Sequence, residues 1–95
     1  MRLTKIEVEK IKETFNEVFK SGKIYLFGSR VDDSSKGGDI DLYVVCDEGK
    51  NLMEKKIDFL VELKQKIGNQ KIDVVIARDK KRVIEQEALT KGIEL

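Results

Sequence analysis

Three short segments of the sequence carry residue types that could do chemistry on phosphates. Gly28-Ser29 follows an apolar run, Asp39-Ile40-Asp41 places two acids two residues apart, and Asp73 stands alone among branched apolar residues. A glycine lets backbone N–H groups approach phosphate oxygens, and a following helical turn would point its positive end at them. The glycine therefore predicts a phosphate cradle. Arg30 either clamps a phosphate there or is an ordinary solvated arginine.

The three aspartates predict a magnesium site. Strand residues two apart lie about 6.5 Å apart on one face, so the carboxylates of Asp39 and Asp41 can converge on a shared cation. Magnesium prefers hard oxygen ligands and is usually held by one or two carboxylates together with substrate phosphates. Asp73 on a neighbouring strand would complete a pocket for two ions about 3.5 to 4 Å apart, a spacing that stabilises both the attacking and the leaving oxygen of a phosphoryl displacement.

Each segment also has a plainer explanation. A Gly-Ser turn after a strand is common, and an Asp-x-Asp pair is ordinary in a chain with 18 acids, because exposed strand faces carry charge at little cost. Asp73 is harder to explain in this way. It lies between Ile72 and Val74 in an expected central strand, where burying an acid is costly unless something pairs it. For Asp73 a paired core acid stays open as the alternative.

Hydrophobic periodicity predicts the elements that would position these residues. Apolar residues at three- and four-residue spacing predict three helices, over 4–20, 51–67 and 79–92. Short apolar runs predict three strands, over 24–27, 39–45 and 72–76, and a turn or short helical piece is expected over 30–38. These elements predict an α/β (α+β) fold in one domain over residues 1–95, with a small three-stranded mixed sheet flanked by about four helices.

Two of these elements carry specific expectations. Alternation in the second strand puts Ile40, Leu42 and Val44 on one face. The other face carries Asp39, Asp41, Tyr43 and Val45. In the second long helix, residues 51–54 resemble a capping box. The apolar residues that follow at helical spacing are Met53, Ile57, Leu60, Val61 and Ile67.

At the candidate site the sequence resembles the nucleotidyltransferase superfamily of DNA polymerase beta. It is most similar to the minimal, MNT-type branch, the antitoxin partner of HEPN-domain toxins. The family pattern is a hydrophobic residue, Gly, then Gly or Ser, a loop, Asp-hydrophobic-Asp-hydrophobic, and a third acid on a later strand. Here it reads Phe27-Gly28-Ser29, nine intervening residues, Asp39-Ile40-Asp41-Leu42, and Asp73. The resemblance runs from the first helix to residues 92–95 and implies the nucleotidyltransferase fold.

The resemblance also implies roles, cofactors and a partner. Asp39 and Asp41 would bind magnesium, in a site for two ions. Asp73 would ligate metal or activate the incoming hydroxyl, and Ser29 would contact the nucleotide phosphates. The implied reaction is transfer of AMP, or another NMP, from ATP or another nucleoside triphosphate to a hydroxyl, with release of pyrophosphate. The implied acceptor is a tyrosine of a HEPN-type toxin, which the chain would neutralise as its antitoxin.

Composition excludes several other classes of function. The sequence has no histidine, so Ser-His-Asp and Cys-His catalysis and the usual zinc sites are excluded. Nineteen Lys and Arg against 18 Asp and Glu give a net charge of +1, which predicts no direct binding of nucleic acid through bulk electrostatics. Cys46 is the only cysteine, and no segment has the length and apolarity of a signal peptide or a membrane span. A cytoplasmic location is therefore expected.

Two rival functions stay open. The same fold could neutralise a partner by contact alone, although a pure binder has no physical need for three convergent carboxylates. Alternatively, the nucleotide could be transferred to a small molecule such as an aminoglycoside, or to an RNA end. The short chain and its neutral charge disfavour both acceptors.

Overall fold

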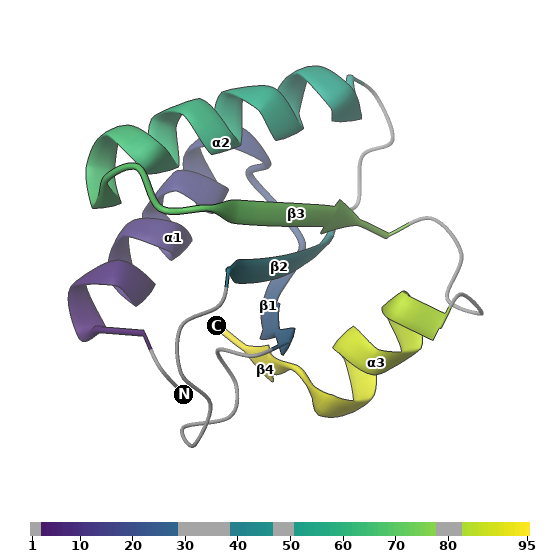
Figure 1. Cartoon of the computed structure of the whole chain (residues 1–95). Helices are drawn as coiled ribbons and strands as arrows, with labels where there is room; N and C mark the ends of the chain where they lie inside the picture. The colour runs from purple at the N-terminus through teal and green to yellow at the C-terminus, as the bar shows by residue number, and fades with distance from the viewer. Residues whose placement is uncertain (1–2, 29–38, 47–50, 78–82) are drawn as a thin grey trace.

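The structure, a computed structural model, describes residues 3–28, 39–46, 51–77 and 83–95 (Figure 1). Along the chain the elements are α1 (Lys5–Val18), β1 (Lys23–Phe27), β2 (Ile40–Val45), α2 (Leu52–Ile67), β3 (Ile72–Ile76), α3 (Val83–Lys91) and β4 (Ile93–Glu94). The strands form one sheet in the order β3-β2-β1-β4. β1 is antiparallel to β2 and β4, whereas β2 and β3 are parallel, so the predicted mixed sheet is confirmed. No helix within the described ranges is long and apolar enough to cross a membrane.

The sheet differs from the prediction in strand number and strand position. It has four strands instead of three, because the chain turns back after Gly92 and pairs β4 with Tyr25 and Leu26 of β1. β3 lies at the edge of the sheet, so the expected central position of Asp73 is wrong. Three helices are present in the described segments, and the short helical piece expected over 30–38 falls outside them.

The helix ends follow local sequence only in part. Thr4 and Glu7 form a reciprocal capping box at the start of α1, which ends at Val18, two residues before its expected end. At α2 the predicted capping box is absent, because Asn51 is left-handed (φ 57°) and makes no side-chain capping hydrogen bond. α2 ends at Gly68 (φ 93°), as expected for a glycine that adopts a positive φ without strain.

Strand alternation divides the sheet into two different faces. One face packs against α1 and α2 in the main apolar core, whose strand residues include Ile24, Leu26, Ile40, Leu42, Val44, Ile72 and Val74. The helices contribute to it mainly through Ile11, Phe15, Phe19, Phe59 and Leu63. A smaller cluster on the opposite face, against α3, consists of Phe27, Tyr43 and Ala88 with the partly buried Tyr25, Val45, Val75 and Ala77. In Figure 1, α1 and α2 lie on one side of the strands and α3 on the other.

Candidate active site

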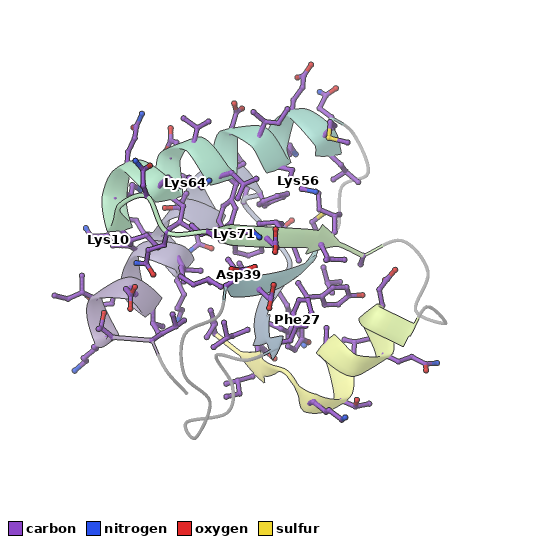
Figure 2. All side chains as sticks on the ribbon, in the orientation of Figure 1. Lys10, Phe27, Asp39, Lys56, Lys64 and Lys71 are labelled. Atoms are coloured by element: carbon purple, nitrogen blue, oxygen red, sulfur yellow. The ribbon has the colours of Figure 1, made fainter. Side chains whose placement is uncertain are left out.

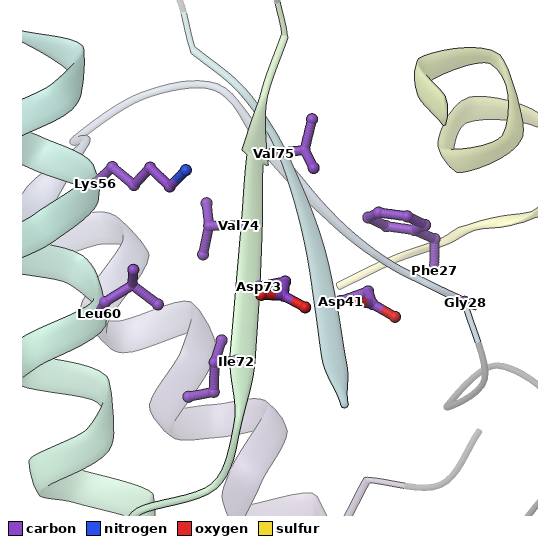
Figure 3. A pocket seen from close by; sticks show the side chains of 9 residues that line it. All are labelled: Phe27, Gly28, Asp41, Lys56, Leu60, Ile72, Asp73, Val74 and Val75. Carbon is purple, nitrogen blue, oxygen red and sulfur yellow. The ribbon is translucent and has the colours of Figure 1, made fainter. Parts of the chain in front are cut away.

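Strand register brings two of the three predicted acids together. Asp41 of β2 is the register partner of Asp73 in the parallel strand β3, and Phe27 of β1 is the register partner of Asp41 on its other side. Adjacent strands lie about 4.8 Å apart, so the two carboxylates are neighbours on one face. Figure 3 shows both pointing to the side of β3 away from α2. Asp73 shares its face with Val75, as the sequence predicted.

The charges at this position repel one another. Burial raises the pKa of Asp41, and the negative charges of Asp73 and Asp39 raise it further, while Lys71 lowers it. A bound cation would relieve this repulsion because it stabilises the carboxylate form. The electrostatics around Asp41 therefore favour a positively charged ligand.

Asp39 lies just before β2 and is held differently. Lys71, the residue before β3, places its Nζ 3.4 Å from Oδ2 of Asp39 (Figure 2). The lysine side chain is 74% exposed, so this is a surface ion pair that contributes little stability and can be exchanged for another cation. This ion pair was not predicted from the sequence, although Asp39 and Lys71 each come one residue before the register partners Ile40 and Ile72.

Gly28 approaches the acids from the end of β1. Its φ of 77° is a conformation that favours glycine, and a Cβ built on it would fall on Oδ2 of Asp41. The glycine thus lets the backbone lie directly beside a carboxylate. Ser29 and Arg30, the other two residues predicted to contact phosphates, lie outside the described residues, so their roles stay predictions.

A pocket of about 680 Å³ extends around the edge strand. On the acid-bearing face its lining comprises Phe27, Gly28, Asp41, Asp73 and Val75. Beyond β3 the lining continues over Ile72, Val74 and, from α2, Lys56 and Leu60 (Figure 3). The candidate site is therefore open at the sheet edge, next to α2.

A buried polar pair beside the acids was also missed from the sequence. Tyr43 of β2 donates a hydrogen bond of 2.8 Å from its Oη to Oε1 of Glu85 on α3, and both residues are fully buried. Burial, together with Glu85, raises the pKa of Tyr43 to about 12. This bond anchors α3 on the face that carries Asp41. Nothing in the sequence near Glu85 indicates its partner, which is 42 residues away.

The carboxylates of the site fit a magnesium ion that is also bound by phosphates. Among the residues that the structure describes, no three acidic or cysteine side chains form a ready-made metal cluster. Asp41 and Asp73 nevertheless offer carboxylate oxygens side by side, and Asp39, just before β2, is paired with an exposed lysine. Magnesium is usually held by one or two carboxylates together with substrate phosphates, so this pair fits an ion that arrives with a nucleotide. The two-ion site stays a prediction.

Comparisons with known proteins show the family and the fold of this chain. The chain matches the family described as "Polymerase beta, Nucleotidyltransferase" over residues 9–95. Among solved structures it is similar to a chain in the crystal structure of the toxin-antitoxin MntA-HpeT, in a mutant designated D39ED41E in that protein. The identity is 22% and the TM-score 0.74, over 90% of this chain and 69% of that chain, and this likeness shows the fold. A search of curated proteins found no match.

Proposed function

This chain belongs to the polymerase beta nucleotidyltransferase family, and we propose that it transfers AMP, or another NMP, from a nucleoside triphosphate to a hydroxyl of a partner protein with the help of magnesium. The observation that carries this proposal is the row formed by Gly28, Asp41 and Asp73 at the mouth of an open pocket. It combines neighbouring carboxylates for a metal with a glycine backbone that phosphates can approach.

In this mechanism Asp41 and Asp39, once Asp39 leaves Lys71, would hold magnesium, and Asp73 would either ligate a metal ion or take the proton of the incoming hydroxyl. The metal, when bound, neutralises charge on the triphosphate and on the displaced pyrophosphate. The backbone at Gly28 orients the phosphates, with Ser29 and Arg30 as further contacts. ATP is the proposed nucleotide.

In this proposal Asp73 serves the acceptor, and its position on the edge strand supports this role. It stands on the edge strand, where a hydroxyl presented by another molecule can reach it. The acceptor oxygen forms a bond to the α-phosphorus, the bond from that phosphorus to pyrophosphate breaks, and the hydroxyl proton passes to the Asp73 carboxylate.

For the partner we propose a HEPN-domain toxin, modified on a tyrosine, with this chain as its antitoxin. Support comes from the fold likeness to a chain of a toxin-antitoxin structure. Protein adenylylation is accordingly the proposed activity.

The test uses purified HEPN-domain partner and ATP labelled on the α-phosphate. Asp39→Ala and Asp41→Ala should each abolish labelling of the partner and keep the fold, because each removes a ligand and also relieves like-charge repulsion. Glu9→Ala is the matched control, an exposed acid on α1, and should label the partner like the wild type. In the wild type, magnesium should raise the melting temperature, more so with ATP, and the double variant should lose this response.

Other outcomes would contradict the proposal. Near-wild-type labelling of the partner by Asp41→Ala would show that the aspartates do not take part in the reaction. A wild type that neutralises the toxin without labelling it would identify a contact-only antitoxin. Labelling of an aminoglycoside or an RNA end, with none of the protein, would assign a different acceptor.

A further inference from the structure

The helix α2 carries an exposed apolar stripe formed by Met53, Ile57 and Val61. These side chains are 61%, 53% and 52% exposed, and their four-residue spacing aligns them along one side of the helix. The apolar side chains that α2 buries are others, Phe59 and Leu63. Of the five large apolar side chains that the described residues leave exposed, three lie in this stripe. Isolated exposed apolar residues are normal, but an aligned row on one helix is typical of an interaction surface.

The stripe lies on the side of the active site from which an acceptor must come. Across the sheet, the order is Gly28 at the end of β1, Asp41 on β2, Asp73 on the edge strand β3, and then α2. In the proposed mechanism the nucleotide phosphates occupy the Gly28 end. The acceptor hydroxyl therefore reaches Asp73 from beyond β3, over the part of the pocket that Leu60 of α2 lines. Leu60 is one helical turn from Ile57, so the stripe lies beside this part of the pocket.

A row of acids runs parallel to the stripe. Glu54, Asp58 and Glu62 each follow a stripe residue by one position, and all three are exposed. An amphipathic partner helix that covers the stripe would meet this row along one flank. Basic side chains on that flank of the partner would complement it.

We propose that Met53, Ile57 and Val61, with the flanking acids, dock the acceptor protein through an apolar helix face that carries basic residues on one side. This inference rests on the proposed function and names the surface that presents the acceptor to Asp73. Two observations favour the acceptor as the occupant: Leu60, one helical turn from Ile57, lines the active-site pocket, and the exposed acids beside the stripe would complement basic residues of a partner.

The experiment compares Ile57→Glu with Ile6→Glu in the full chain. Both isoleucines are exposed on a helix, at 53% and 66%, but Ile6 lies on α1, away from the pocket. Affinity for the HEPN-domain partner is measured by isothermal titration calorimetry, MgATP affinity by the same method, and AMP transfer as a function of partner concentration. Ile57→Glu should weaken partner binding about 30-fold or more, as expected for a central interface residue, and raise the KM for the partner to match. Ile6→Glu should change neither value.

A charge-reversal arm tests the partner's chemistry. The triple variant Glu54→Lys, Asp58→Lys and Glu62→Lys should lower partner affinity about 10-fold and reduce the dependence of that affinity on salt. Unchanged partner affinity in this triple variant would overturn the inference that the partner carries basic residues next to the acids of α2.

Two further results would overturn the docking surface. One is partner binding and KM in Ile57→Glu equal to the wild type while the wild type labels its partner. The other is a wild-type dimer in sedimentation that Ile57→Glu dissociates without affecting partner binding, because the stripe would then join two copies of this chain. Failure of the proposed function is distinguishable from both, since in that case the wild type itself transfers no AMP.

Discussion

The two faces of the sheet are made by alternate residues of the same strands, yet they are built for different purposes. In β2, Ile40, Leu42 and Val44 are completely buried beneath α1 and α2. Asp41 and Tyr43 point to the opposite face, where α3 covers the tyrosine and leaves the aspartate partly exposed at the pocket. One face is closed and apolar, whereas the other combines a buried hydrogen bond with mutually repelling carboxylates.

This difference teaches that stability and chemistry are separated within single strands. Apolar burial on the face covered by α1 and α2 provides most of the favourable free energy of folding, because the hydrophobic contribution is proportional to the apolar area removed from water. On the other face the carboxylates of Asp39, Asp41 and Asp73 work against folding until a cation arrives, because each charge raises the cost of its neighbours. Replacing a buried apolar residue and replacing one of these carboxylates should therefore have effects of opposite sign on stability.

The largest expected change in stability is on the apolar face. Leu42→Ala should lower the free energy of unfolding by about 2 to 5 kcal/mol, the usual cost of truncating a fully buried leucine. Urea unfolding followed by circular dichroism measures it. A cost below about 1 kcal/mol would show that this face does not provide the stability assigned to it.

A smaller loss is expected beneath α3. Tyr43→Phe removes the hydrogen bond to Glu85 and should cost about 1 to 3 kcal/mol, because a buried acceptor loses its donor. The pKa of Tyr43 is raised from 10.0 to about 12, so the stability that its protonated form contributes is complete below pH 10 and is lost as the pH rises towards 12. The wild type should therefore lose stability in this range, and Tyr43→Phe should lose less. Tyr25→Phe, on the same face, is the control, and equal alkaline losses in wild type and Tyr43→Phe would contradict the assignment.

The smallest expected change has the opposite sign. Asp41→Asn in metal-free buffer should raise stability at pH 7, because burial, Asp73 and Asp39 all disfavour the Asp41 carboxylate. A raised pKa in the folded state means that this destabilisation is present above the folded pKa. It fades as the pH falls through that pKa and is absent below the ordinary value of 3.8. Thermal melts from pH 3 to 7 in EDTA measure the difference, and a less stable Asp41→Asn at pH 7 would refute the repulsion.

The sequence predicted the parts of the site that depend on local pattern. Alternation in residues 39–45 predicted that Asp41 and Leu42 lie on opposite faces of the sheet, which the structure confirms. The glycine after an apolar run predicted the turn at Gly28, where the structure has a positive φ. Both follow from strand geometry and from the conformational freedom of one residue, and neither needs knowledge of distant contacts. The direction of Asp73 was predicted for the same reason.

Features that depend on pairing order and packing could not be predicted. β4 has only two residues, too few for a pattern, and the pairing of β3 with β2 alone, which puts β3 and Asp73 at an edge, leaves no local signal in the sequence. In α2 two apolar rows have helical spacing, and the sequence does not tell which row faces the sheet. In the structure Phe59 and Leu63 are buried in the core, whereas Met53, Ile57 and Val61 are exposed. The Tyr43–Glu85 hydrogen bond likewise needs α3 in place.

The central claim is that the acid-bearing face carries out nucleotidyl transfer, and Asp73→Asn tests it most directly. Asparagine keeps the shape of the side chain but cannot take the acceptor's proton. We predict that single-turnover AMP transfer to the purified partner falls about 10² to 10⁴-fold, with MgATP affinity nearly unchanged if Asp73 acts as the base. A weakened dependence on magnesium in the same variant would assign Asp73 to the metal instead and keep it in the site. An Asp73→Asn protein that transfers AMP at the wild-type rate would contradict the account.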